Sequence, residues 1–87
     1  WHLWALTEPS PRGRMNRWHQ VTQRFPEDKL AHAALADNAA GVASAENDSV
    51  ALKLAVGTYE MLLATATAPN ERTALTDALT TLKKWSF

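Results

Sequence analysis

The sequence predicts a small all-α protein, a bundle of about four helices joined by short loops. In four segments the apolar residues recur at three- and four-residue spacing, which places them on one face of a helix. A proline or a capping residue stands at the start of each segment. We find no pair of strand-like segments, and 87 residues are enough for one domain only. We therefore expect an up-and-down arrangement of helices over about 11–25, 27–41, 49–67 and 70–85.

The segment 11–25 begins with a hydroxyl cap at Ser10 and with Pro11 at the first helical position. Gly13 weakens the first turn by roughly 1 kcal/mol relative to alanine. Pro26 ends the segment because proline cannot continue a helix. The apolar stripe, which is expected to face the core, consists of Met15, Trp18, Val21 or Thr22, and Phe25.

The segment 27–41 carries Glu27 and Asp28 in its first turn, where the helix dipole favours negative charge. Its predicted end lies near Gly41, although the alanine-rich sequence also permits a continuation to Ala45. The residues from Glu46 to Ser49 are typical of a loop that supplies the next helix cap. The predicted buried face consists of Leu30, Ala31, Ala34, Leu35 and Asn38.

The segment 49–67 is the most apolar, and its large residues point in more than one direction. We therefore expect this helix to lie centrally, with neighbours on several sides. Gly57, in its middle, predicts a close crossing by another backbone. One side carries Val50, Leu54, Met61 and Leu62, and another carries Leu52, Val56, Tyr59 and Leu63.

The last segment, 70–85, follows a turn at Ala68–Asn70 and ends with Lys83 and Lys84, where positive charge is favoured. Residues 1–10 are treated as an N-terminal aromatic arm, and residues 11–87 as the single domain. The spacing of Trp1 and Trp4 fits a helix, but the arm fits a short strand as well. The apolar stripe of the last segment consists of Leu75, Ala78, Leu79, Leu82 and Trp85.

Composition restricts the class of protein. Cysteine is absent, so disulfides and cysteine metal sites are excluded. No run of about 18 apolar residues could span a membrane, and we see no signal peptide, so we expect a soluble protein, with the cytoplasm favoured. Alanine makes up 16 of the 40 hydrophobic residues and buries little area. Because such a core is thin, we expect a partner chain or a second copy.

Charge is distributed unevenly although the net charge of the chain is zero. Residues 1–25 carry four arginines and one glutamate, a net charge of +3. Residues 26–60 carry two lysines and six acidic residues, a net charge of −4. The two regions either pair within the molecule or form two separate faces for partners.

Residues that could carry catalysis are sparse, and we expect no enzyme, no metal site and no cofactor. His32 follows Asp28 at helical spacing, but two ligands make a weak metal site. Glu60, beside Tyr59 in the most apolar segment, would act as an acid or base in an apolar cleft shared with His32. The alternative, which we prefer, is that Glu60 lies on the polar edge of its helix.

The arginine-rich first helix suggests two kinds of partner. Nucleic acid is one, because arginine binds phosphate bidentately and aromatic rings stack on bases. The residues that would contact it are Arg12, Arg14, Arg17, Gln20 and Arg24. The same arginines are equally explained as the solvated side of the helix, with some paired to acidic residues that follow in the sequence.

The leading prediction is a non-enzymatic protein-interaction or oligomerisation module, a small adaptor or regulatory protein whose partner is another protein or a second copy. Tryptophan and arginine are the residues enriched in interface hot spots. The aromatic residues of the two chain ends either meet in a small core of their own or serve as exposed anchors. The predicted contact residues are Trp1, Trp4, Arg12, Arg14, Arg17, Trp18 and Trp85.

Overall fold

A computed structural model describes all 87 residues and confirms the predicted all-α fold. It contains five helices and no strands: α1 (His2–Leu6), α2 (Pro11–Arg24), α3 (Lys29–Glu46), α4 (Ser49–Thr65) and α5 (Pro69–Lys83). The four long helices correspond to the four predicted segments. The aromatic arm, for which a helix and a strand were both open, contains the short helix α1.

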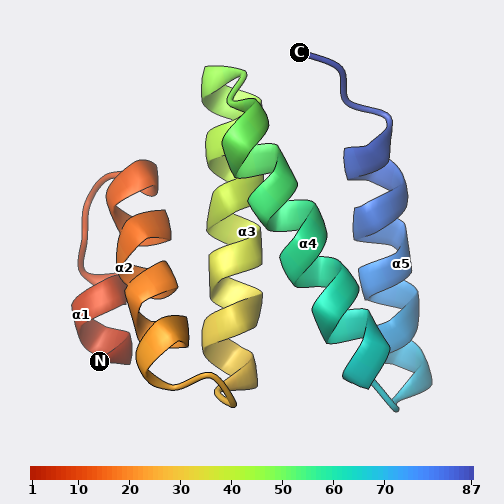
Figure 1. Cartoon of the computed structure of the whole chain (residues 1–87), viewed down its shortest axis with the longest axis horizontal. Coiled ribbons are helices and arrows are strands. Elements are labelled where there is room, and N and C mark those ends of the chain that lie inside the picture. The colour runs from red at the N-terminus through yellow and green to blue at the C-terminus, as the bar shows by residue number, and fades with distance from the viewer.

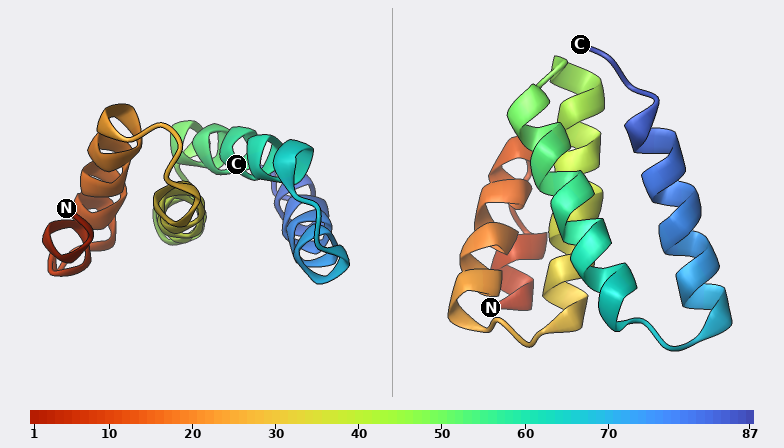
Figure 2. Two further views of the ribbon diagram at one scale, coloured as in Figure 1. Left: turned by 90° about the horizontal axis from the view of Figure 1, so that it is seen from below. Right: turned by 45° about the vertical axis from the view of Figure 1, so that its right-hand side comes forward.

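The helices form a flat slab in which consecutive helices are neighbours (Figure 1). Seen end on, they alternate between two layers, with α2 and α4 in one layer and α1, α3 and α5 in the other (Figure 2). The slab measures 31 × 30 × 17 Å. Helix α4 packs against α3 on one side and α5 on the other, in agreement with its predicted central position. Helix α1 lies at one edge of the slab and α5 at the other.

Side-chain caps fix the starts of three long helices. The hydroxyl of Ser10 accepts a hydrogen bond from the N–H of Gly13 at 2.9 Å, as the sequence predicts. Asp28 caps α3 through the N–H of Ala31 at 3.1 Å. Asp48 caps α4 through the N–H groups of Val50 and Ala51, at 2.9 and 3.0 Å. Two aspartates therefore define the starts of the two central helices.

Two expectations about glycine differ from the structure. Helix α3 does not end at Gly41 but continues to Glu46, because Val42 and Ala43 are buried and the helix ends only at Asn47, whose φ is 51°. The predicted backbone crossing at Gly57 is wrong. A Cβ at Gly57 would meet nothing within 4 Å, so this glycine faces open space.

The core lies along the middle of the slab and is built largely from small side chains. Only 19 of the 87 residues are buried, because a two-layer array leaves most helices with one open face. Alanines make up much of the buried surface of α3 and α4. Trp18, Val21 and Val42 are the largest fully buried side chains. The buried alanines of α3 and α4 are Ala31, Ala36, Ala39, Ala43, Ala51 and Ala55. No helix is both long and apolar enough to cross a membrane.

Candidate functional site

Aromatic and arginine side chains converge at the edge of the slab formed by α1 and α2. We call Trp1, Trp4, Arg17, Arg24 and Phe25 the aromatic–arginine face. The ring of Trp1 meets Trp4 edge-on at a centroid distance of 5.7 Å and Phe25 at 5.8 Å. The guanidinium of Arg17 lies 4.9 Å from the centroid of Trp4, and that of Arg24 lies 5.2 Å from the centroid of Trp1. Such contacts contribute about 0.5–1 kcal/mol each at exposed positions.

Helix α1 holds this face in place although five residues are too few for a stable isolated helix. Ala5 is fully buried against the rest of the protein. His2 lies beside Asp28, with Nε2 2.5 Å from Oδ2. Arg17 donates a hydrogen bond of 2.7 Å to the carbonyl oxygen of Trp4. These contacts orient α1 so that its remaining side chains point outward.

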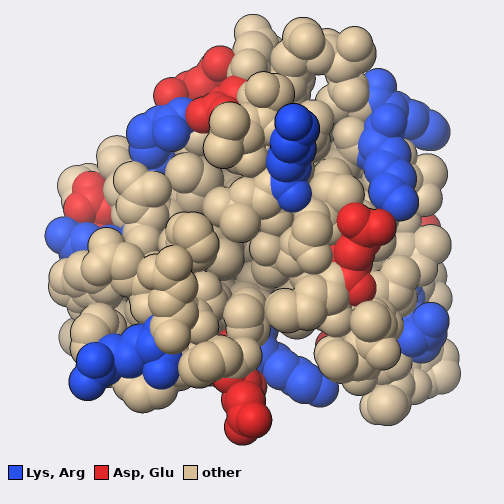
Figure 3. Space-filling model, in the orientation of Figure 1, with Lys and Arg blue, Asp and Glu red and all other residues tan.

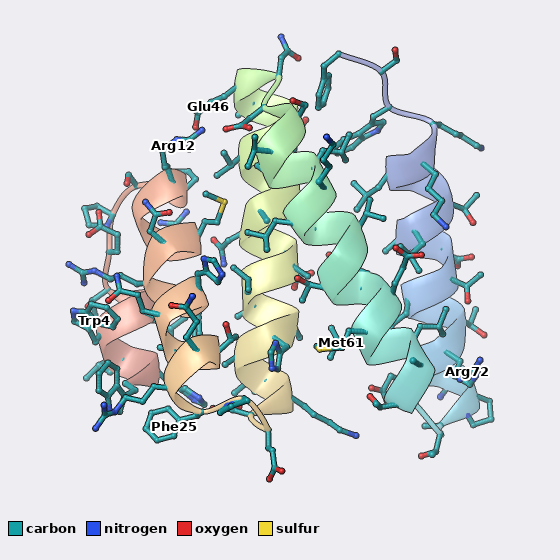
Figure 4. All side chains as sticks on the ribbon, in the orientation of Figure 1. Trp4, Arg12, Phe25, Glu46, Met61 and Arg72 are labelled. Atoms are coloured by element: carbon teal, nitrogen blue, oxygen red, sulfur yellow. The ribbon has the colours of Figure 1, made fainter.

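The outward side of α1 is apolar. Leu3 is 72 % exposed and Leu6 is 61 % exposed. Trp1 and Trp4 line an open hollow of about 420 Å³ together with Gln20. Figure 4 shows Trp4 on the outer side of α1 and Phe25 at the lower end of α2. The aromatic–arginine face thus continues into an exposed apolar surface on a helix that no other part of the chain covers.

Glu8 connects this face to the start of α2. Its carboxylate pairs with Arg17 at 3.1 Å and lies 3.3 Å from the backbone nitrogen of Ser10. The side chain of Glu8 passes over Gly13, where a Cβ would collide with it. Glycine at position 13 therefore makes room for the Glu8 side chain, although glycine has a weak helix propensity. The fixed carboxylate holds the guanidinium of Arg17 over Trp4.

The other two predicted contact arginines of α2 are engaged within the molecule. Arg12 pairs with Glu46 at 3.1 Å and with Asp48 at 2.6 Å, which joins α2 to the turn between α3 and α4 (Figure 4). The hydrogen bond that Arg12 donates to Asp48 lowers the pKa of Asp48, and so do the hydrogen bonds from the backbone N–H groups that Asp48 caps. Arg14 donates to Asn38 at 3.2 Å and to two backbone carbonyl oxygens at 3.0 Å.

The predicted nucleic-acid contacts therefore do not form one open basic surface. Arg12, Arg14 and Arg17 have acceptors within the protein, and Arg24 stacks on aromatic rings. Gln20 is exposed in the hollow beside the tryptophans. On the face seen in Figure 3, groups of both signs are scattered over the surface rather than gathered into one basic area.

Two of the predicted partner-contact tryptophans lie elsewhere. Trp18 is only 2 % exposed and belongs to the core, so we remove it from the candidate contact residues. Trp85 is half-buried near the end of α5, with its ring 6.2 Å from that of Phe87. The aromatic residues of the two chain ends do not meet, because α1 and α5 occupy opposite edges of the slab (Figures 1 and 2). They form two separate clusters.

The residues considered for catalysis are not brought together. Glu60 lies in contact with solvent, 3.7 Å from Lys83. Tyr59 donates a hydrogen bond of 2.5 Å to Asp37, and burial together with this bond raises the pKa of Tyr59. His32 lies 2.7 Å from the carbonyl oxygen of Pro26. The three side chains line three different surface hollows. No three histidine, aspartate or glutamate side chains cluster as metal ligands.

Four residues of the site region were missed by the sequence analysis or assigned to another role. Phe25 was expected in the core stripe of α2 but is 40 % exposed and meets Trp1 edge-on, because it follows the last helical residue. Leu3, Leu6 and Glu8 were not selected at all. The signal for the two leucines is their spacing of three, which places them together on one side of a helix.

The comparisons with known proteins do not assign a function. No model of a known protein family matches the chain. Neither the curated proteins nor the solved structures that were searched give a match. The function must therefore be argued from the residues of this chain and from the geometry described above.

Proposed function

We propose that this protein is a non-enzymatic interaction module that binds another protein through the aromatic–arginine face. The observation that carries the proposal is the unpartnered apolar surface of α1, continuous with two tryptophans that arginines hold in place. Exposed apolar surfaces rimmed by polar groups are typical of interaction sites. Tryptophan and arginine contribute most to such sites because they combine a large contact area with directed hydrogen bonds.

The chemistry of the face favours a particular class of partner. Trp1, Trp4 and Leu3 offer apolar area. Arg24 has no carboxylate within ion-pair distance, so its guanidinium is free to receive one from outside. The partner we propose is therefore a protein segment with large apolar side chains and at least one acidic residue placed to reach Arg24.

A nucleic acid is the less favoured partner. Binding to phosphates requires several cationic side chains that are free to neutralise them. Three of the four arginines of this region have hydrogen-bond acceptors in the protein itself. Neutralisation within the molecule, rather than a separate basic face, is the better account of the net positive charge of residues 1–25.

A displayed library of random peptides, selected on the immobilised protein, tests the proposal. We expect enriched peptides that combine aromatic or leucine residues with acidic ones. Trp4→Ala should weaken their binding at least about tenfold, because it removes a central anchor. Arg24→Gln should weaken it less and should reduce its dependence on salt.

Trp85→Ala is the matched control, because this tryptophan is half-buried at the opposite edge of the slab. Peptide affinity should be unchanged in this variant. The proposal is overturned if no peptide is enriched, or if Trp4→Ala and Trp85→Ala affect the selected peptides equally. Circular dichroism of both variants checks that each remains helical.

A further inference from the structure

Helix α4 carries a largely exposed apolar seam on the side that borders the hollow between α4, α3 and α2. Its members are four, three, four and three residues apart, which is the spacing of the core positions in a coiled coil. From Val50 to Ala64 the seam extends for roughly 21 Å along α4. We call this set the α4 seam, and it consists of Val50, Leu54, Gly57, Met61 and Ala64.

The α4 seam lies open to solvent. Val50 is 74 % exposed and Met61 is 41 % exposed. Gly57 and Ala64 are exposed, and Leu54 is partly so. Figure 4 shows Met61 on the side of α4 that faces α3, and in Figure 1 α4 passes in front of α3. Leu54 also packs partly against the core, but the chain leaves Val50, Gly57, Met61 and Ala64 largely open to solvent.

Gly57 lies at the centre of the seam and lowers the surface there. A hollow of about 300 Å³ on the α2 side of α4 and another of about 320 Å³ on the α5 side share Gly57 and Lys53 in their linings. Glycine in a helix interior costs about 1 kcal/mol relative to alanine. No neighbour within 4 Å requires it. A small residue at this place instead allows a helix from outside to approach α4 closely.

We propose that a second copy of this chain occupies the seam, with the two α4 helices packed antiparallel about a two-fold axis. The seam residues alternate between the two core positions of a coiled coil. In an antiparallel pair, each residue at one kind of core position lies opposite a residue at the other kind on the partner helix. The register that aligns the seams places Leu54 against the partner's Gly57, where the leucine fills the space above the glycine. The same register places Val50 against the partner's Met61.

Charges that flank the seam fit this register. Lys53 pairs with no carboxylate in the chain, and Glu60 has only the exposed contact with Lys83 at 3.7 Å. In the antiparallel pair, Lys53 lies beside the partner's Glu60, and the symmetry forms this contact twice. Sliding the pair by one heptad would bring Glu60 against the partner's Glu60. The charges therefore favour a second copy and select one register.

This dimer does not depend on the proposed function. The α4 seam belongs to the layer of α2 and α4, whereas the aromatic–arginine face lies around α1 at the edge of the slab (Figure 2). Loss of one contact should leave the other intact. Variants of the aromatic–arginine face and of the α4 seam are therefore tested both for peptide binding and for self-association. Each proposal can then fail without the other.

Sedimentation equilibrium of the full chain over a concentration series tests the dimer. We expect a concentration-dependent monomer–dimer equilibrium for the wild type. Gly57→Leu should weaken it at least about tenfold, because the new side chain occupies the space that receives Leu54. This substitution should not unfold the monomer, since leucine favours helix and nothing lies within 4 Å. Gly41→Leu is the matched control, because a Cβ there also meets nothing within 4 Å.

A charge exchange tests the register independently. Lys53→Glu and Glu60→Lys should each weaken the dimer, and the double variant should restore it, because the exchanged charges again face opposite charges. The proposal is overturned if the wild type remains monomeric at millimolar concentration. It is also overturned if Gly57→Leu and Gly41→Leu associate alike, or if the double variant fails to restore association.

Discussion

His2 of α1 and Asp28, the residue before α3, are joined by a contact of 2.5 Å between Nε2 and Oδ2. The other carboxylate oxygen of Asp28 accepts the hydrogen bond from Ala31 that caps α3. The imidazole also lies 5.3 Å from the ring of the buried Trp18. One carboxylate therefore starts a central helix and attaches the helix that carries the aromatic–arginine face.

Two substitutions of Asp28 should separate these roles. Asn is as good a helix cap as Asp, so Asp28→Asn should keep the cap of α3 and weaken only the attachment of α1. Asp28→Ala should lower the free energy of unfolding by about a further 1 kcal/mol, because it removes the cap as well. Urea denaturation measures the difference, and amide hydrogen exchange in α1 reports its attachment. Equal effects of the two substitutions would contradict the double role.

Stability should fall in acid because two capping carboxylates lose their charge. The hydrogen bond from His2 lowers the pKa of Asp28, and that from Arg12 lowers the pKa of Asp48. Their stabilising effect is complete above the unfolded value of about 3.9 and is lost as pH falls through the lower folded values. The free energy of unfolding should therefore decline as the pH falls below about 4. In Asp28→Asn the decline should be shallower, and an identical decline would contradict the assignment.

At alkaline pH the relevant group is Tyr59. Its raised pKa, caused by burial and by the bond to Asp37, means that the folded state resists deprotonation more than the unfolded state does. The stabilisation is complete below about pH 10 and is lost as pH rises further. Tyr59→Phe should lower stability at pH 7 by about 1 kcal/mol and should reduce the alkaline decline. Unfolding curves of both proteins between pH 7 and pH 11 measure this, and parallel pH profiles would refute it.

Trp18 should be indispensable for folding. Replacing a buried tryptophan with alanine costs about 3–5 kcal/mol, which equals the whole stability expected of a small core. Trp18→Ala should therefore give a largely unfolded chain, detected by lost ellipticity in circular dichroism. Trp85→Ala, which changes a half-buried residue at the slab edge, should remain folded. A folded, cooperatively melting Trp18→Ala would show that the core is not organised around this ring.

Single-stranded and duplex oligonucleotides should not bind with appreciable affinity. Arg12, Arg14 and Arg17 are engaged within the protein, which leaves too few free cations for several phosphate contacts. Fluorescence anisotropy at low and then moderate salt measures any binding. Affinity that falls by one to two decades across that range would mean about three or four phosphate contacts. That result, lost in Arg14→Ala/Arg17→Ala, would favour the nucleic-acid alternative.

The helices could be predicted from the sequence because their signals are local. Ser10 with Pro11, and the acidic residues near 28 and 48, mark helix starts by chemistry that acts within one turn. The predictions of a helix end at Gly41 and of a backbone crossing at Gly57 were wrong because both depend on packing between distant parts of the chain. Propensity disfavours glycine within a helix, but the buried residues after Gly41 carry α3 onward, and only the packed structure reveals that nothing crosses Gly57.

The candidate site was only partly predictable. Trp1, Trp4 and Arg17 could be selected by residue type, because tryptophan and arginine dominate interfaces. Whether Leu3 is exposed and Trp18 is buried depends on which side of α1 docks against α2. That choice is decided by contacts between residues distant in the sequence, such as His2 with Asp28, which local patterns do not encode.

The succession of helices in the slab has a consequence for how cooperativity is transmitted. Each helix relies mainly on the helices before and after it in the chain, so most of the coupling between the two edges passes from helix to helix. The contacts of His2 with Asp28 and of Arg12 with Asp48 each skip one helix. Helix α5, held chiefly by α4, forms a terminal unit that can open while the remainder stays intact. The molecule thus behaves as a short linear series of coupled helices. A ligand that binds at one edge should stabilise the adjacent helix most and the helix at the opposite edge least.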